Sequence, residues 1–196
     1  HVYNGSAWVN EGILHESEAR TNVFTYSSDL SNVVWGMVTS TTTANAGVSP
    51  SGLTDALRWE GTGSSTFYQS TAYIDTATYT VSCWVKSNGA SKDTFRLFGR
   101  DSYISADFTA TSDWVRYSFT FTTTQIASAS RQAGVARDTA GADTDLLLYG
   151  FQIELGSTPS SYIPTTSGAT VTRAAETLTV PAANLPYDST NMSIQM

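Results

Sequence analysis

The sequence predicts an all-β chain folded as an antiparallel β-sandwich, and three observations support this. Apolar and polar residues alternate with a period of two in short segments separated by turn-like clusters, along a chain of 196 residues. Aromatic residues reach 12% while charged residues are only 14%, a balance that suits pleated strands rich in β-branched and aromatic side chains. No long amphipathic helical pattern occurs, and the gaps between segments are too short for crossover helices. A jelly roll is the most economical arrangement.

We expect about eight to ten strands. The clearest alternation lies in "ATYTVSCWVKSNG", which ends at the turn signal Asn88-Gly89, and in "DWVRYSFTFTT". The Gly/Ser-rich stretch "GTGSS" predicts a turn between two further strands. The expected strands cover residues 56–61, 66–74, 77–89, 93–101, 102–110, 113–123, 131–138 and 146–155.

Charge and hydropathy exclude two classes of partner. The formal net charge is -7, and only 10 basic residues are scattered among 17 acidic ones. Nucleic-acid binding requires clustered Lys and Arg, so we expect no nucleic-acid partner. The longest apolar runs are far too short to cross a bilayer, so we expect no membrane insertion, and nothing at His1 resembles a signal peptide.

Catalysis finds little support in the residue types. His1 and His15 are the only histidines, and zinc-protease, phosphate-loop and dinucleotide motifs do not occur. A pair of glycosidase carboxylates stays open among 17 acids, although no pair stands out. Cys83, the single cysteine, shares a strand face with Val81 and Val85, which favours a buried core thiol over a nucleophile. A non-enzyme without a cofactor is favoured.

Three blocks of the sequence carry a family resemblance. They are "LHESEARTNVFTYSSDLSNVVW" (Leu14–Trp35), "YTVSCWVKS" (Tyr79–Ser87) and "YGFQIELGSTPSSYIPT" (Tyr149–Thr165) continued into "GATVTRAAETLTV". Together they resemble a domain family of bacteriophage tail fibres, tail spikes and head fibres. The resemblance implies a jelly roll similar to the carbohydrate-binding modules of xylanase-type enzymes, located on the virion as part of an extracellular fibre or spike.

The resemblance also implies a function and partners. We expect a non-catalytic module that attaches the virion to its host by binding cell-surface polysaccharide, assembled with other fibre or virion subunits as a homo-oligomer, with a trimer in keeping with such fibres. Two alternatives stay open: a structural spacer or assembly domain without a ligand, and an accessory module of a polysaccharide-degrading enzyme. Modules of this kind often hold a structural calcium ion, so calcium stays open without assigned ligands.

Sugar binding needs exposed aromatic faces beside planar polar groups, and the alternation brings such residues together. If the strands neighbour each other, their outward residues line one concave face. The alternative is a polar sheet face with an Arg–Glu pair across strands. The predicted carbohydrate-binding residues are Trp84, Arg96, Trp114, Arg116, Gln152 and Glu154.

Other conspicuous residues favour structural roles. Trp35 and Trp59 are expected in the core, and Trp8 is expected to pack on a neighbouring chain or domain. Arg20 and Arg173 are expected to clamp loop carbonyls or a carboxylate. The candidate carboxylates for these clamps are Glu16, Glu18 and Glu176.

The loop "RDTAGADTD" carries Asp138, Asp143 and Asp145, whose oxygens suit Ca²⁺, although solvated turn acids are the preferred interpretation.

The chain is expected to divide into three parts. An incoming segment covers 1–22, the sandwich covers 23–165, and a C-terminal extension covers 166–196. The extension contains Pro181 and Pro186 and stops within an apparent strand, "MSIQM". We therefore expect a fragment of a longer product that continues into another domain.

Overall fold

The computed structural model describes residues 2–3, 8–9, 15–71, 74, 76–89, 92–100, 104–123, 131–137 and 143–177. The chain divides into two compact units. One consists of Arg20–Arg173, and the other of the terminal segments His1–Ala19 and Ala174–Met196. Within the described residues there is no helix that could span a membrane.

The strands are numbered in the order in which they occur along the chain. The terminal unit contains β1 (Val2–Tyr3) and β2 (Trp8–Val9), where Trp8 lies opposite Tyr3. The strands of the larger unit are β3 (Arg20–Asn22), β4 (Gly36–Val48), β5 (Thr54–Ser70), β6 (Thr78–Ser87), β7 (Thr94–Arg100), β8 (Ile104–Thr109), β9 (Val115–Thr122), β10 (Gln132–Ala136), β11 (Thr144–Leu155) and β12 (Val171–Arg173).

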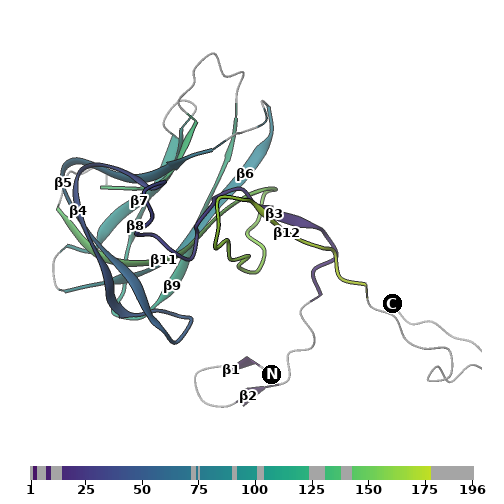
Figure 1. Ribbon diagram of the computed structural model, residues 1–196, viewed down its shortest axis with the longest axis horizontal. Coiled ribbons are helices and arrows are strands. Elements are labelled where there is room, and N and C mark those ends of the chain that lie inside the picture. Colours follow the sequence, from purple (N-terminus) through teal and green to yellow (C-terminus); the bar gives the residue numbers. More distant parts are fainter. Residues whose placement is uncertain are drawn as a thin grey trace, which may run out of the picture. The chain divides into compact units, whose positions relative to one another are not determined.

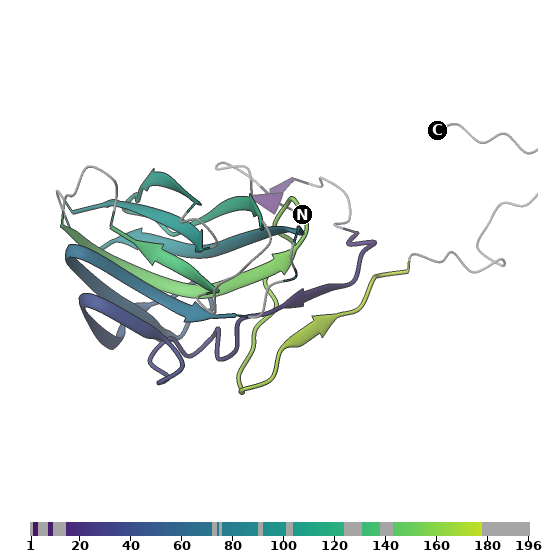
Figure 2. The ribbon, with the colours of Figure 1, turned by 90° about the horizontal axis from the view of Figure 1, so that it is seen from above.

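The larger unit is built on an 8-stranded antiparallel sheet in the order β8-β7-β10-β5-β11-β6-β9, with β4 alongside β5 (Figure 1). The long strand β5 joins two layers, because Leu57–Gly61 pairs with β11 whereas Thr66–Ser70 pairs with β10. We call β8, β7, β10 and the second half of β5 layer A. Layer B consists of β9, β6, β11 and the first half of β5. The short β3 and β12 lie side by side as a separate ribbon (Figure 2).

The core lies between the layers and is rich in aromatic rings. Phe95 of β7 meets Tyr117 of β9 edge-on, with ring centroids 5.1 Å apart, which shows that the inner faces of layers A and B oppose each other. Trp35 stacks on Phe67 at 5.2 Å, and Trp59 and Cys83 are fully buried. The predicted core roles of Trp35, Trp59 and Cys83 are therefore confirmed.

The predicted strands are found in order, and the differences concern β5, β4 and the short ribbon of β3 and β12, which was not expected. The expected strands 56–61 and 66–74 are parts of one strand, β5, which continues through the predicted turn because Gly63 adopts a positive φ of 61° and lets the backbone bend between layers. Strand β4 was not expected, since its sequence GMVTSTTTANAGV lacks apolar alternation. The all-β sandwich itself is confirmed.

Candidate functional site

Most of the predicted site residues gather on the outer face of layer B. Trp84 of β6 lies opposite Arg116 of β9 on one side and Tyr149 of β11 on the other. Gln152 and Glu154 follow on β11, opposite Ser82 and Thr80 of β6. The strands are thus neighbours as expected, and Trp84, Arg116, Gln152 and Glu154 share one face.

This face is covered by the chain itself. Gln152 and Glu154 are 0% exposed, because the segment 156–165 that follows β11 folds back over them. The amide N–H of Ser160 donates to Glu154 Oε1 at 2.9 Å and its hydroxyl donates to Oε2 at 2.7 Å, while Gln152 Nε2 donates to Oε1 at 2.6 Å. The amide N–H of Ile163 donates to Gln152 Oε1 at 2.6 Å. Gln152 and Glu154 therefore point to the outer face as predicted, but neither is accessible there, since both bind the returning segment.

Arg116 fastens the same segment. Its guanidinium lies 4.7 Å from the centroid of the Trp84 ring and donates to the carbonyl of Ser160 at 2.6 Å and to the hydroxyl of Ser82 at 2.9 Å. Burial lowers the pKa of Arg116, and the nearby Glu154 carboxylate opposes this shift. Because the guanidinium already occupies a face of the half-buried Trp84 ring, this pair is better suited to holding the segment than to stacking on a sugar.

Asn22, in the N-terminal block Leu14–Trp35, also holds the returning segment. Buried Asn22 donates to the carbonyls of Phe151 and Ile163, at 3.0 and 2.9 Å, and accepts from the amides of Phe24 and Ile153 at 3.1 Å each. These bonds tie the first strand of the larger unit to β11 and to the returning segment. The sequence prediction did not single out Asn22, although a buried polar residue in a motif is a signal of such a role.

The two motif arginines act as clamps. Arg20 donates to the carbonyl of Leu155, and Arg173 donates to the hydroxyl of Ser161 at 2.7 Å. Within the terminal unit, Glu176 accepts from the amide of Glu16 at 3.0 Å. The expected clamping of a loop carbonyl is confirmed for Arg20.

Trp114 and Arg96 lie apart from this cluster. The half-buried Trp114 donates its indole N–H to the carbonyl of Val48 at 3.0 Å, which fixes the ring beside the end of β4. Arg96 lies on β7, between Phe95 and Leu97, which point into the core. Because side chains alternate along a strand, Arg96 lies on the outer face of layer A, on the other side of the sandwich. The expectation of a single face for all these residues is wrong for Arg96.

The outer face of layer A carries an aromatic residue that the sequence prediction missed. Tyr68 of β5 is half-buried and lies opposite Gly36 of β4 and Gly134 of β10. A Cβ added at Gly36 would come within 2.8 Å of Tyr68 Cζ, so the ring leans over the glycine backbone. The signal was present, because Phe67 points inward and the next residue must then point outward.

Polar residues accompany Tyr68 on this face. Arg96 lies opposite Asp107 of β8, which is exposed, and opposite Ala136 of β10, which is next to the half-buried Thr66. The outward positions of β10 around this row are small, Gly134 and Ala136. Phe98 is buried, so the accessible part of the face lies around Tyr68, Thr66 and Arg96.

The loop acids considered for Ca²⁺, for which solvated turn acids were the preferred interpretation, do not form a metal site among the described residues. Asp145 accepts from Arg58 at 2.9 and 2.7 Å and from Asn88 at 3.0 Å, and the Arg58 bonds hold the pKa of Asp145 below its usual range. Asp143 is exposed, and Asp138 lies outside the described residues. Among the residues that the structure describes, no group of three or more His, Cys, Asp or Glu side chains is placed to hold a metal ion.

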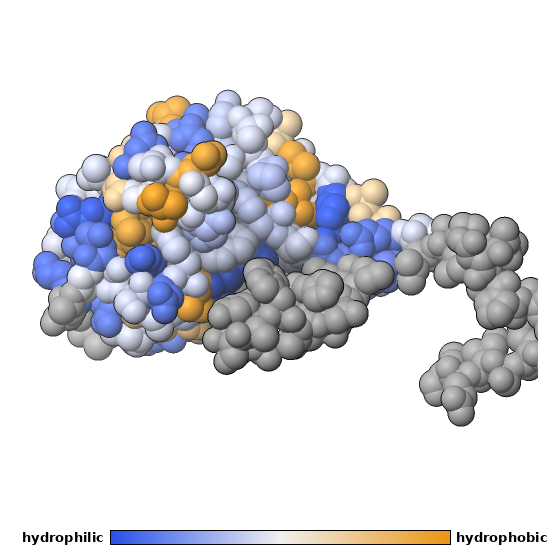
Figure 3. Space-filling model, turned by 90° about the horizontal axis from the view of Figure 1, so that it is seen from below, coloured by the Kyte–Doolittle hydropathy of each residue, from blue (hydrophilic) through white to orange (hydrophobic). Residues whose placement is uncertain are grey.

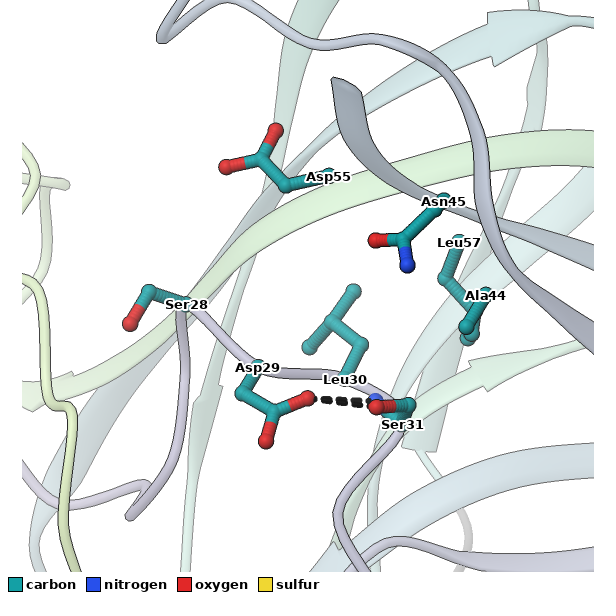
Figure 4. A pocket seen from close by; sticks show the side chains of 8 residues that line it. All are labelled: Ser28, Asp29, Leu30, Ser31, Ala44, Asn45, Asp55 and Leu57. Carbon is teal, nitrogen blue, oxygen red and sulfur yellow. Dashed lines mark hydrogen bonds between the residues drawn. The ribbon is translucent and has the colours of Figure 1, made fainter. Parts of the chain in front are cut away.

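A small acidic pocket lies between the segment after β3 and the β4–β5 hairpin (Figure 4). Asp29, Asp55 and Asn45 surround an apolar floor of Leu30 and Leu57. The space is about 50 Å³, which is comparable with one or two water molecules at roughly 30 Å³ each and too small for a sugar ring.

The surface offers little continuous apolar area on the face drawn in Figure 3. Hydrophobic side chains among the coloured residues form separate groups surrounded by hydrophilic ones. Broad apolar patches mark protein or membrane contacts, and the described part of this face does not carry one.

No protein-family model matches the sequence, and no curated protein matches it. Among solved structures, the tandem CBM22-1–CBM22-2 domain from Paenibacillus barcinonensis Xyn10C is similar with a TM-score of 0.51 and 19% identity, over 74% of this chain and 47% of that one. An exo-β-agarase is similar with a TM-score of 0.52 and 8% identity, over 71% of this chain and 26% of that one. The chain thus spans less than half of either protein. At such identities the likeness concerns the fold alone, and it confirms a jelly-roll sandwich similar to that of carbohydrate-binding modules.

Proposed function

We propose that the chain is a non-catalytic carbohydrate-binding module whose ligand binds on the outer face of layer A. The observation that carries this proposal is Tyr68, held over Gly36 on a face shared with Arg96 and Asp107. The outer face of layer B is a poorer candidate, because segment 156–165 covers Gln152 and Glu154. The fold shared with a CBM22 tandem domain supports the same class of function.

The chemistry of this face suits a sugar chain. An aromatic ring packed on backbone offers its remaining face to the apolar C–H face of a sugar ring. Arg96 provides planar donors and Asp107 provides acceptors, so hydroxyl groups find both kinds of partner. Adjacent strands are about 4.8 Å apart, which places the Arg96 and Thr66 backbones about 10 Å from each other. That separation accommodates a sugar unit lying across β10, with a second unit against Tyr68.

We also propose that the module serves host attachment as part of a virion fibre or spike. The three sequence blocks that resemble phage fibre domains support this role. They include Asn22, Gln152 and Glu154, whose hydrogen bonds hold the returning segment 156–165 in place. Binding on an open sheet face is weak per site, and several copies on one homo-oligomeric fibre would raise the overall affinity. The accessory module of a polysaccharide-degrading enzyme is equally consistent with the fold, since the similar agarase and Xyn10C chains are longer.

A glycan array probed with the multimerised full chain tests the proposal, followed by titration of the best glycan. Tyr68→Ala is expected to weaken binding about three- to tenfold, in line with the value of an aromatic contact. Tyr68→Phe keeps the ring and serves as the matched control, with binding close to the original. Circular dichroism establishes that both variants fold. If the multimer binds no glycan, the spacer role replaces the proposal, and release of reducing ends by the chain would instead establish an enzyme.

A further inference from the structure

A second open site lies at the end of layer B, away from Tyr68. A groove of about 440 Å³ separates the loop after β6 from the loop between β8 and β9. Small-molecule sites typically measure about 300–1,000 Å³, so the groove has room for sugar rings. Its lining residues are Lys86, Ser87, Asn88, Gly89, Asp93, Ala110 and Ser112.

Lys86 is the residue of the groove that indicates a ligand. The side chain is half-buried, and no hydrogen bond or ion pair with the described residues engages its ammonium group. A lysine ammonium group that has no acidic partner in the protein gains from an anionic ligand, because the ion pair forms charge-assisted hydrogen bonds. The chain has a net charge of -7, so this cation stands out against its surroundings.

The rest of the groove supplies complementary groups. Asp93 is half-buried in the same lining, and its carboxylate can accept from hydroxyl groups. Asn88 donates its amide N–H to Asp145 at 3.0 Å, which orients the side chain and leaves its carbonyl oxygen as an acceptor. The lining therefore combines one cation with several acceptors for hydroxyl donors.

We propose that this groove is a second binding site that takes an acidic saccharide, whose carboxylate binds Lys86 while its hydroxyl groups bind Asp93 and Asn88. A uronic acid unit has these features in one ring. The inference rests on the proposed function only in taking the ligand to be a saccharide, because the residues involved are separate from Tyr68 and Arg96.

Titration of the full chain with cellobiouronic acid and with cellobiose tests this site, since the two sugars differ by one carboxylate. At low ionic strength the acidic sugar is expected to bind about five- to tenfold more tightly, the value of a charge-assisted hydrogen bond at a half-exposed position. High salt should reduce that ratio. Nuclear magnetic resonance shifts should locate the acidic sugar at residues 86–89 and 110–112.

The two lysines of the chain provide a matched pair of variants. Lys86→Gln should bring the affinity ratio close to one, whereas Lys92→Gln, at an exposed position outside the groove lining, should leave it unchanged. Asp93→Asn should weaken both sugars by a similar factor.

Failure to bind cellobiouronic acid, or a ratio that survives Lys86→Gln, would overturn the inference. The proposed function is judged separately by Tyr68→Ala, which should leave the ratio intact and lower only binding at the layer A face.

Discussion

The buried carboxylate of Glu154 offers a quantitative test of how the larger unit is held closed. Replacing it in Glu154→Ala removes the acceptor of three hydrogen bonds, two from Ser160 and one from Gln152. The hydroxyl of Ser160 and the amide of Gln152 keep a longer alternative bond to the carbonyl of Ser161, at 3.3 Å each. The amide N–H of Ser160 has no such alternative among the described bonds.

The expected cost follows from these partners. A buried donor left without an acceptor costs about 1–3 kcal/mol, and the weakened bonds and the emptied volume add to it, giving about 3–5 kcal/mol in total. For a unit of this size the melting temperature should fall by about 6–20 °C. Urea unfolding followed by tryptophan fluorescence measures the change in the free energy of unfolding.

A surface glutamate provides the control. Glu60 is 39% exposed and forms an ion pair with Arg58 at 2.9 Å, and removal of such a partner typically changes stability by less than about 1 kcal/mol. If Glu154→Ala costs no more than Glu60→Ala, segment 156–165 is not held by this network and the structural role given to Glu154 is wrong.

Three further predictions concern other residues. Burial raises the pKa of the Cys83 thiol, so at pH 8 the thiol should be unreactive towards a disulfide reagent in the native protein and fully reactive in denaturant. Because Arg58 lowers the pKa of Asp145, the carboxylate stabilises the fold above its unfolded pKa and this contribution is lost as the pH falls through the folded pKa; Asp145→Asn should flatten the stability–pH curve between about pH 5 and 2. Gly36→Ala should displace the Tyr68 ring, weakening glycan binding about threefold or more while changing the free energy of unfolding by less than about 1 kcal/mol, so an unchanged affinity would contradict the role given to Tyr68.

The fold could be predicted wherever burial leaves a pattern in the sequence. Strands β6 and β9 alternate because their inner residues enter the core, and both were predicted close to their observed bounds. Strand β4 is mostly exposed along its length, so its Thr and Ser residues carry no apolar period, and only its hydrogen bonds to β5 make it a strand. The bend of β5 likewise depends on partners that are distant in sequence.

The candidate site shows a different limit. Alternation correctly placed Trp84 and Arg116 on one outer face, because each is preceded and followed by residues that point the other way. It could not show that the chain would return over that face, since the returning segment is held by tertiary bonds to Glu154 and Gln152. Nor could it assign Arg96 to layer A, because layer membership depends on strand order rather than on period.

The β3–β12 ribbon has a mechanical consequence. Arg20 and Arg173, at the two outer ends of the unit, are register partners in an antiparallel ribbon of three residue pairs. Tension applied through residues 20 and 173 therefore loads the ribbon bonds one after another, as in a zipper, rather than all at once. Opening the ribbon also breaks the bonds of Arg20 to Leu155 and of Arg173 to Ser161, and it should lengthen the link by a few residues on each side. Asn22, with its buried bonds to Phe151 and Ile163, is where such peeling should stop. A module built in this way would yield slightly at its attachment before its β-sandwich carries any load.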